Sequence, residues 1–250
     1  MVAILVLLVV IVILKRSYPK VKGAIGEKKV NGILSNLPSD TYRIWNDLYV
    51  PNKKKGTSQI DHVVLTNNGL FVIETKNYQG WIFGHEQSQY WTQSIYKRKE
   101  RFHNPIWQNY GHIRALKELL QEDLPNEFPI YSIIVFSDKA TLKSTFENAS
   151  VINNKQLLST IKELNSNIFY EAIPLKSMIE KITKYAITDK KLKKQISKQH
   201  IIQIREDRKL DSQKIKQNIC PRCGSSLVER KRKNGSFIGC SGFPKCRYTR

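Results

Sequence analysis

Residues 59–76 read QIDHVVLTNNGLFVIETK, and this stretch decides the fold. Two runs rich in apolar and β-branched residues predict two strands, Gln59–Thr66 and Leu70–Lys76. Asn67-Asn68-Gly69 separates the runs and predicts a tight turn, so we expect an antiparallel hairpin. Because both runs are almost continuously apolar, the hairpin is expected to be buried within a larger sheet.

Helical and extended patterns alternate around this hairpin. Gly23–Leu37 carries apolar side chains at helical spacing, and Asn104-Pro105 begins a second predicted helix that ends near Gln121. The apolar run Pro129–Phe136 predicts a strand buried on both faces. The other predicted elements are strands at Trp81–Phe83, Tyr90–Ile95 and Ile168–Ile173 and helices at Lys155–Leu164 and Leu175–Ala186. We therefore expect an α/β domain over residues 20–187, with a mixed central sheet flanked by helices.

Charge is distributed unevenly along the 250 residues. The chain has 42 Lys and Arg residues against 21 Asp and Glu residues, a formal net charge of +21. Residues 1–175 hold 21 basic and 15 acidic residues, whereas residues 176–250 hold 21 and 6. This distribution excludes a uniformly basic protein and favours an ordinary domain followed by a segment that binds a polyanion. Residues 188–217 lack Pro and Gly and predict a basic helical linker.

Residues 1–16 contain the apolar run Val2–Leu14, followed directly by Lys15 and Arg16. A membrane span normally takes about 20 apolar residues, so a buried strand or helix and a signal peptide are alternatives. A cleaved signal peptide carries its basic residues before the apolar run, whereas here they follow it. We expect a single-pass membrane anchor, with the N-terminus outside and the main domain cytoplasmic, because basic residues stay on the cytoplasmic side.

All four cysteines lie near the end of the chain, as Cys220-x2-Cys223 and Cys240-x5-Cys246. Two close pairs separated by a short arm can place four thiolates tetrahedrally around one Zn²⁺. Two disulfides or free thiols are the alternative, which a cytoplasmic compartment disfavours. Because so short a segment cannot build a sufficient core, we expect Zn²⁺ to supply the folding free energy of a zinc finger over residues 218–250.

Aromatic and basic residues are interleaved within this finger. Aromatic rings can stack on unpaired bases, and cationic groups can contact phosphates. The rings can instead form the small core of the finger, and the basic arm can meet a membrane surface or a protein. The residues expected to contact a nucleic acid in this way are Arg230, Arg232, Phe243, Lys245 and Tyr248.

Charged residues lie at adjacent ends of the two hairpin strands. Asp61 is on the first strand, while Glu74 and Lys76 share one face of the second because side chains alternate along a strand. Charges beside a buried hairpin need partners or a metal. Two carboxylates can hold Mg²⁺ or Mn²⁺, and a lysine beside them can orient or deprotonate water during phosphodiester hydrolysis. A cross-strand ion pair on a solvated face is the alternative.

The two predicted helices carry polar groups that can join this cluster. Glu27 lies at the edge of the apolar stripe of the first helix rather than opposite it. Gln108 and His112 lie one turn apart on the same face of the second helix, and no chemistry is assigned to the histidine. The four tryptophans are interpreted as packing residues of the core and its lip rather than as base-stacking groups: Trp45, Trp81, Trp91 and Trp107.

The motifs GAIGEKKV (23–30), QIDHVVLTNNGLFVIETKNYQGWIFG (59–84), YW (90–91) and NPIWQNYGHIRAL (104–116) resemble the nuclease-related domain (NERD) family. This family is assigned to the PD-(D/E)xK nucleases, near Mrr-type restriction endonucleases, so the resemblance over about residues 22–135 implies a restriction-endonuclease-like fold. One departure from the superfamily pattern is Ile60, which replaces the proline before the first acid. The resemblance implies that Glu27 is the first-helix acid and that Asp61 is the metal-binding acid. It also implies that Glu74 and Lys76 form the ExK pair and that Gln108 is the glutamine of the later helix.

The C-terminal segment is similar to the four-cysteine zinc finger of bacterial type IA topoisomerases. The matching residues are Cys220-Pro221-x-Cys223-Gly224, Gly239-Cys240-Ser241 and Phe243-Pro244-x-Cys246. In those enzymes such modules are associated with single-stranded DNA. The two resemblances imply a metal-dependent DNA nuclease at the cytoplasmic face of the membrane, with a zinc finger that assists DNA binding. The alternatives are a non-catalytic DNA-binding protein that uses the nuclease-like fold as a scaffold, and a basic tail that binds lipid.

Overall fold

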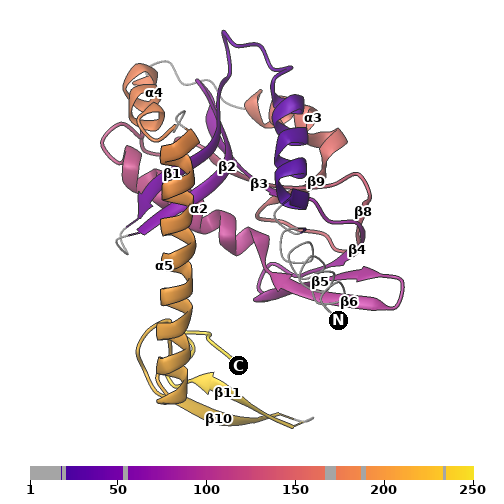
Figure 1. Cartoon of the computed structure of the whole chain (residues 1–250), viewed down its shortest axis with the longest axis vertical. Helices are drawn as coiled ribbons and strands as arrows, with labels where there is room; N and C mark the ends of the chain where they lie inside the picture. The colour runs from indigo at the N-terminus through magenta and orange to yellow at the C-terminus, as the bar shows by residue number, and fades with distance from the viewer. Residues whose placement is uncertain (1–17, 19–20, 53–55, 167–172, 187–189, 233–234) are drawn as a thin grey trace, which may run out of the picture. The chain divides into compact units, whose positions relative to one another are not determined.

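The computed structural model describes residues 18, 21–52, 56–166, 173–186, 190–232 and 235–250. The chain divides into two compact units, Met1–Asp189 and Lys190–Arg250. The first unit contains a five-stranded sheet (Figure 1) whose order is β1 (Arg43–Asn52), β2 (Gly56–Thr66), β3 (Gly69–Lys76), β7 (Ile130–Phe136) and β9 (Ser150–Asn153). Its second sheet has the order β6 (Arg98–His103), β5 (Tyr90–Ile95), β4 (Gly80–Phe83) and β8 (Ala140–Leu142).

The β2–β3 hairpin lies in the middle of the five-stranded sheet. Thr66 pairs with Gly69 across the two-residue turn Asn67-Asn68. β1 is antiparallel to β2, whereas β7 is parallel to β3, so the sheet is mixed. Residues 69–74 are all buried, as the continuous apolar run predicts. The expected α/β fold with a mixed sheet is confirmed.

Helices cover both faces of this sheet. α2 (Pro105–Leu120) and α4 (Leu175–Thr183) lie on one side, and the first helix (residues 21–34) and α3 (Leu157–Asn165) lie on the other (Figure 1). Val72 and Leu116 are fully buried in the first layer, and Phe71 and Leu34 in the second. Burying each such side chain contributes about 1.5–3 kcal/mol, so the two layers hold the hairpin firmly.

Several predicted elements are observed with small shifts of their ends. α2 begins at Pro105, and the side chain of Asn104 caps it by accepting a hydrogen bond from Ile106 N at 2.9 Å. No pattern in the sequence predicted β1, β6, β8 or β9. β6 reads RKERFH and lies at an exposed edge, so it has no apolar alternation to reveal it. The predicted strand Ile168–Ile173 falls, apart from Ile173, outside the described residues.

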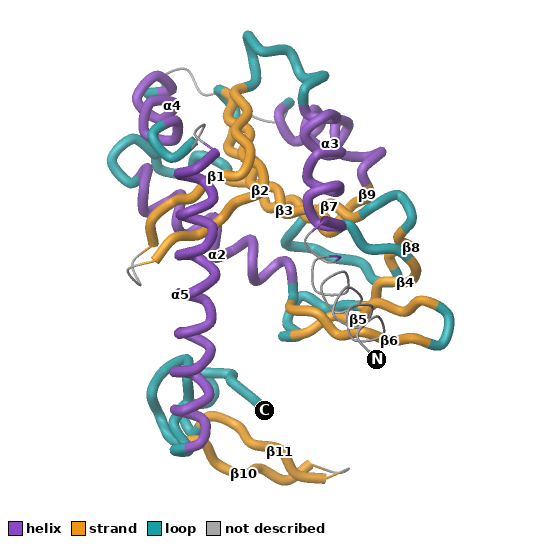
Figure 2. Tube along the Cα trace, viewed as in Figure 1, coloured by secondary structure: helices purple, strands orange, loops and turns teal. Residues whose placement is uncertain are grey.

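The second unit consists of α5 (Lys190–Lys216) and a hairpin of β10 (Leu227–Arg232) and β11 (Gly235–Cys240), drawn as tubes in Figure 2. Most of the described side chains of α5 are exposed. Within the described ranges, no helix combines the length and the apolarity that a membrane crossing requires. The expected anchor, residues 1–16, lies outside those ranges.

Candidate functional site

Four of the predicted site residues meet at one end of β2 and β3. The paired residues of these strands end at His62–Ile73. Two residues beyond Ile73, Thr75 N–H donates to Asp61 Oδ2 at 2.8 Å. Lys76 Nζ donates to Glu74 Oε1 and, at 3.0 Å, to Gln108 Oε1 from the first turns of α2. The structure therefore brings both hairpin acids, the lysine and the glutamine together.

A local distortion of β1 and β2 aims the Asp61 carboxylate. Ile60 and Val63 both pack in the core layer under α2, although residues three apart on a regular strand point to opposite faces. Opposite this point of β2, Asp47 of β1 has a left-handed backbone with φ of 55°. The regular alternation of side chains is therefore interrupted at Asp61. This interruption allows the Asp61 side chain to reach the end of β3.

Glu27 approaches the cluster from the first helix. Its neighbour Gly26 is buried against the end of β3, where an added Cβ would lie only 2.6 Å from Asn77 Cβ. Asn77 Nδ2 also donates to Lys22 O at 2.6 Å, which ties the helix to the residue after β3. Glu27 lies near enough to raise the pKa of Asp61 electrostatically. The glycine therefore lets the helix bring a third carboxylate to the site.

The charges of the cluster shift one another's pKa values in opposite directions. Burial, followed by the carboxylates of Glu74 and Glu27, raises the pKa of Asp61 well above its usual value. Burial acts in the same direction on Glu74, but Lys76 and His112 outweigh it and lower the pKa of Glu74 to about 2. The pKa of Lys76 is raised, because Glu74 and Asp61 outweigh the effect of its burial. Glu74 and Lys76 thus form an ion pair at neutral pH, whereas the fold disfavours the ionised form of Asp61.

This donor set suits a divalent cation chemically but is not a closed cage. Among the described residues, only the four cysteines form a group of three or more Cys, His, Asp or Glu side chains whose ligand atoms all lie within 4.8 Å of one another. Glu74 already accepts from Lys76 and, through Oε2, interacts with His112 Nε2 at 3.2 Å. A carboxylate has about four lone-pair sites, so further coordination is open to it. A cation would also offset the burial and the repulsion from Glu74 and Glu27 that together raise the pKa of Asp61.

Two polar residues of α2 support the cluster, although the sequence predicted no role for either of them. His112 contacts the buried Glu74 carboxylate from one turn beyond Gln108. Asn109 is fully buried, and its Nδ2 donates to Val72 O at 2.8 Å and to Ser132 Oγ at 2.9 Å. These bonds fix α2 to β3 and β7. One feature of the sequence could have indicated these roles. Asn109 and His112 lie on the same face of the helix as its apolar core residues, where polar side chains need partners.

His62 is buried beside the site, with 1% of its surface exposed. Its Nδ1 lies 2.6 Å from Asn46 Oδ1, and Asn46 Nδ2 donates to Asn31 Oδ1 of the first helix at 2.8 Å. Burial lowers the pKa of His62 to about 4. The neutral form of the ring is therefore the form that the fold accommodates.

We expect His62 to make the first unit less stable in mild acid. Its pKa is lowered from 6.5 to about 4, so its contribution is complete above pH 6.5 and is lost as the pH falls toward 4. The loss amounts to at most about 3 kcal/mol. Urea unfolding of metal-free protein at several pH values, followed by tryptophan fluorescence, measures it, because all four tryptophans precede residue 190.

A His62→Gln variant should show a shallower dependence of unfolding free energy on pH than the wild type. His85→Gln is the matched control, because His85 is exposed. Equal pH slopes for wild type and His62→Gln would contradict this account.

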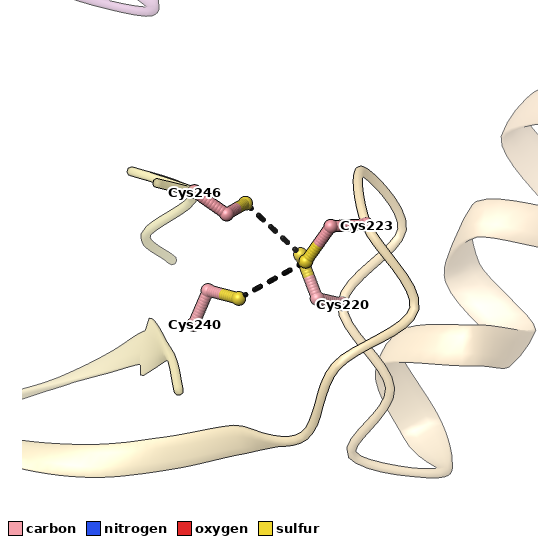
Figure 3. Close-up of side chains that lie close together, drawn as sticks. All are labelled: Cys220, Cys223, Cys240 and Cys246. Atoms are coloured by element: carbon pink, nitrogen blue, oxygen red, sulfur yellow. Dashed lines mark hydrogen bonds between the residues drawn. The ribbon is translucent and has the colours of Figure 1, made fainter. Parts of the chain in front are cut away.

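The four cysteine sulfurs converge at the base of the β10–β11 hairpin (Figure 3). Tetrahedral Zn²⁺ with Zn–S bonds of about 2.3 Å places sulfurs about 3.8 Å apart. Cys220 and Cys246 sulfurs are 3.7 Å apart and those of Cys223 and Cys240 are 3.3 Å apart, with no disulfide. Gly242 N–H donates to the Cys240 sulfur at 3.3 Å, as backbone amides do to metal-bound thiolates. The residues thus form a zinc site, as the spacing predicts.

The residues expected to contact DNA lie in different surroundings around this site. Arg230 donates to Cys240 O at 3.0 Å and stands over the Phe243 ring, 5.6 Å from its centroid. Phe243 is 58% exposed and Lys245 is exposed, whereas Tyr248 packs against the cysteine cluster. The Arg232 side chain is not among those described. Contact of these residues with DNA stays a prediction, as do the catalytic and metal-binding roles of the cluster in the first unit.

Comparisons with known proteins match both parts of the chain. Residues 22–137 match the family described as nuclease-related domain, and residues 217–250 match the family described as topoisomerase DNA binding C4 zinc finger. An uncharacterized protein of Bacillus anthracis is 42% identical over 131 residues, which cover 52% of this chain and 60% of that protein.

Two relatives match only the C-terminal segment. DNA topoisomerase 1 of Methanocaldococcus jannaschii is 63% identical over 36 residues, 14% of this chain and 5% of that enzyme. DNA topoisomerase 1 of Methanothermobacter thermautotrophicus is 60% identical over 30 residues, 12% of this chain and 4% of that enzyme. The chain therefore spans less than two thirds of each of these three relatives. No solved structure matches it. Both resemblances noted in the sequence are confirmed.

Proposed function

Because this chain carries a nuclease-related domain and a C4 zinc finger of the topoisomerase type, we propose that it is a metal-dependent nuclease that hydrolyses DNA phosphodiester bonds. One observation carries the proposal. Asp61, Glu74, Lys76 and Gln108 form a cluster at the end of the hairpin, with Glu27 close enough to act on it electrostatically. Acids and an amine brought together in this way suit an attack on a phosphodiester.

Each residue of the cluster has a role that its contacts support. Asp61 and Glu74, with the Thr75 carbonyl, would hold Mg²⁺ or Mn²⁺, which polarises the phosphate and offsets its charge when bound. With its pKa raised by its carboxylate partners, Lys76 is protonated at neutral pH. It is therefore suited to donate to water or a phosphate oxygen rather than to act as a base.

The two helices complete the same site. Gln108 accepts from Lys76 through Oε1, so its amide nitrogen can donate to the nucleophile or to the phosphate. Glu27 would complete the acidic site or hold a second metal or a water molecule. Because Gly26 has no side chain, the first helix can approach Asn77 closely, and this approach brings Glu27 near the cluster.

Asp61→Asn tests the metal site without relying on activity alone. A raised pKa means that folding disfavours the ionised form, so the Asp61 carboxylate lowers the unfolding free energy above about pH 4, where it is ionised in the unfolded chain. In EDTA at neutral pH, Asp61→Asn should therefore melt higher than the wild type, by about 2–4 °C for each kcal/mol that the burial and repulsion of the carboxylate cost the wild type. The amide oxygen of Asn can still accept from Thr75 N–H.

Adding Mg²⁺ or Mn²⁺ should reverse this order. Metal that binds only the folded state raises the melting temperature of the wild type, and it should leave Asp61→Asn unchanged and unable to cleave DNA. Asp40→Asn, on the exposed surface, is the matched control and should behave as the wild type. Equal metal-induced shifts in wild type and Asp61→Asn would overturn the assignment of this site.

A non-catalytic DNA-binding protein is the second candidate. The observation that favours it is the pairing of Glu74 with both Lys76 and His112, together with the absence of a three-carboxylate cage among the described residues. A scaffold without catalytic activity needs only that Glu74 is paired with Lys76 and His112, and it needs no bound metal. Assays of DNA cleavage and DNA binding separate the two functions, because equal binding without cleavage by wild type or variants would favour the scaffold.

The zinc finger would assist by binding DNA, including single strands. Linking a second binding module to the first unit raises the effective concentration of the strand at the catalytic cluster. Phe243 offers an exposed ring for stacking, and Lys245 a charge for phosphate. Its similarity to the C4 zinc fingers of DNA topoisomerases supports DNA as the ligand.

A location at the cytoplasmic face of a membrane belongs to the same proposal. Its support is the apolar run Val2–Leu14 followed by Lys15 and Arg16. Protease treatment of intact and permeabilised cells tests it. Fractionation of the intact protein with soluble proteins would contradict the anchor and leave the nuclease proposal untouched.

A further inference from the structure

The four-stranded sheet of the first unit has one face on the core and one face in solvent. Ile82 and Trp91 pack into a core cluster with Phe136, and Phe102 lies against it. The opposite face follows from the strand register, because directly paired residues point to the same side. Its pairs are Trp81–Ser94, Phe83–Thr92, Ser94–Lys99, Thr92–Arg101, Tyr90–His103 and Trp81–Thr141.

Three large aromatic side chains stand on this open face. Trp81 is 54% exposed, Phe83 41% and Tyr90 43%. Trp81 and Phe83 are two residues apart on β4, with ring centroids 6.3 Å apart. Trp81 therefore does not lie in the core. Exposed aromatic groups gathered on one face mark an interaction site more often than chance exposure.

Positive charge accompanies these rings. The Arg101 guanidinium lies 4.6 Å from the centroid of Tyr90, and Lys143 Nζ lies 4.8 Å from that of Trp81. Lys99 is exposed on the same face. The paired strand positions of this face, all of them among the described residues, include no Asp or Glu. The face thus combines flat apolar surfaces with cations and no opposing charge, which complements a polyanion with planar groups.

A series of rings leads from this face to the first turn of α2, which also carries Gln108. The Tyr90 ring lies 5.8 Å from His103, and the His103 ring lies 6.3 Å from Trp107. Trp107 directly precedes Gln108, which accepts from Lys76. Figure 2 shows the same relation in the backbone, where β6 leads into the N-terminal end of α2. A strand on the open face would therefore extend toward the cluster within one unit of the protein.

We propose that this open face, defined here as the aromatic face, binds the unpaired bases of a DNA strand beside the catalytic cluster. Its members are Trp81, Phe83, Tyr90, Lys99, Arg101 and Lys143. The rings stack on bases whatever their sequence, and the cations contact the phosphates between them. A duplex keeps its bases stacked on one another and gains much less. The inference rests on the proposed function for the identity of the ligand, while binding itself requires no cleavage.

The affinity of full-length protein for fluorescent oligonucleotides tests the aromatic face. Trp81→Ala/Phe83→Ala should weaken the binding of a short single strand by about tenfold or more, since each base-stacking ring contributes roughly 5- to 150-fold. Binding of a blunt duplex should change little. Tyr110→Ala is the matched control, because Tyr110 is 47% exposed and points away from Gln108 on α2.

The salt dependence of single-strand binding tests the cations of the aromatic face. The double variant Lys99→Gln/Arg101→Gln should bind with a weaker dependence on salt concentration than the wild type, whereas Lys162→Gln should not.

Photo-crosslinking locates the contact independently of the zinc finger. A single strand that contains bromodeoxyuridine should crosslink to peptides that include Trp81 or Phe83. Crosslinks confined to residues 217–250, or equal loss of single-strand and duplex affinity in the double variant, would overturn the inference. So would a double variant that binds the oligonucleotide normally but loses binding to vesicles of phosphatidylserine and phosphatidylcholine, which would identify a membrane-facing surface instead.

The outcomes for the aromatic face and for the nuclease are separable. A wild type that binds single strands through Trp81 and Phe83 but never cleaves would refute the proposed activity and keep this inference. If the wild type cleaves in a metal-dependent way and the double variant binds and cleaves as well as the wild type, the proposed activity is supported and the inference about the aromatic face is refuted.

Discussion

Lys76→Ala is expected to slow metal-dependent cleavage of DNA by about 100- to 1,000-fold. The size follows from removing one preorganised donor from the place where negative charge grows on the reacting phosphate. Lys76 is the central contact of the cluster, since it donates to both Glu74 and Gln108. Single-turnover rates at saturating Mg²⁺ measure the loss, and the affinity for DNA should change much less than the rate.

Loss of folding must be distinguished from loss of chemistry in this variant. The side chains of Lys76 and Glu74 are only 16% and 2% exposed, and breaking such a buried pair destabilises a protein by about 3–5 kcal/mol. Lys76→Arg keeps the positive charge beside Glu74, so it should keep more stability while losing the geometry that Gln108 and the substrate require. Lys29→Ala, which removes an exposed lysine paired with Asp138, is the control. Cleavage by Lys76→Ala at the wild-type rate would refute the proposed active site.

Cys240→Ser is expected to abolish zinc binding and unfold the C-terminal finger. Structural Zn²⁺ contributes about 10–16 kcal/mol in zinc-finger peptides at neutral pH, far more than a segment of this size can replace by packing. The buried cluster here consists of Cys220, Leu227, Cys240 and Cys246, so three of its four members are the sulfur ligands themselves. Elemental analysis should give one zinc per wild-type chain and none for the variant.

The unfolding should be confined to the finger. NMR signals from residues 217–250 should collapse to narrow dispersion in Cys240→Ser, while tryptophan fluorescence is unchanged because no tryptophan follows residue 189. Ser236→Ala, at an exposed position of β11, is the control. A variant that retains stoichiometric zinc and a dispersed spectrum would rule out a four-cysteine site.

Much of the fold could be predicted because its signals are local. The turn Asn67-Asn68, the Asn104 cap and the apolar run of β7 each act over a few residues, and each forms where it was expected. β6 was missed for the opposite reason. Its charged sequence is held as a strand by pairing with β5 on one side, and that partner is not visible in the residues themselves.

The candidate site divides in the same way. Asp61, Glu74 and Lys76 are close in sequence, and a hairpin necessarily brings its two strands together. The contact between His112 and Glu74 joins α2 to β3 across 38 positions of sequence. It depends on how α2 packs over the sheet, which Asn109 helps to set through Val72 and Ser132. No pattern within either segment contains that information.

The amino-acid sequence by itself determined the central hairpin with acids and a lysine at its ends, and the two cysteine pairs that can enclose one zinc ion. These follow from alternation, turn chemistry and ligand spacing, which act along the chain. Only the tertiary structure decided that His112 supports Glu74 and that Trp81 faces solvent while Trp91 faces the core. The physical reason is that burial depends on which face of a sheet receives the other elements, and that choice is made by packing between distant segments.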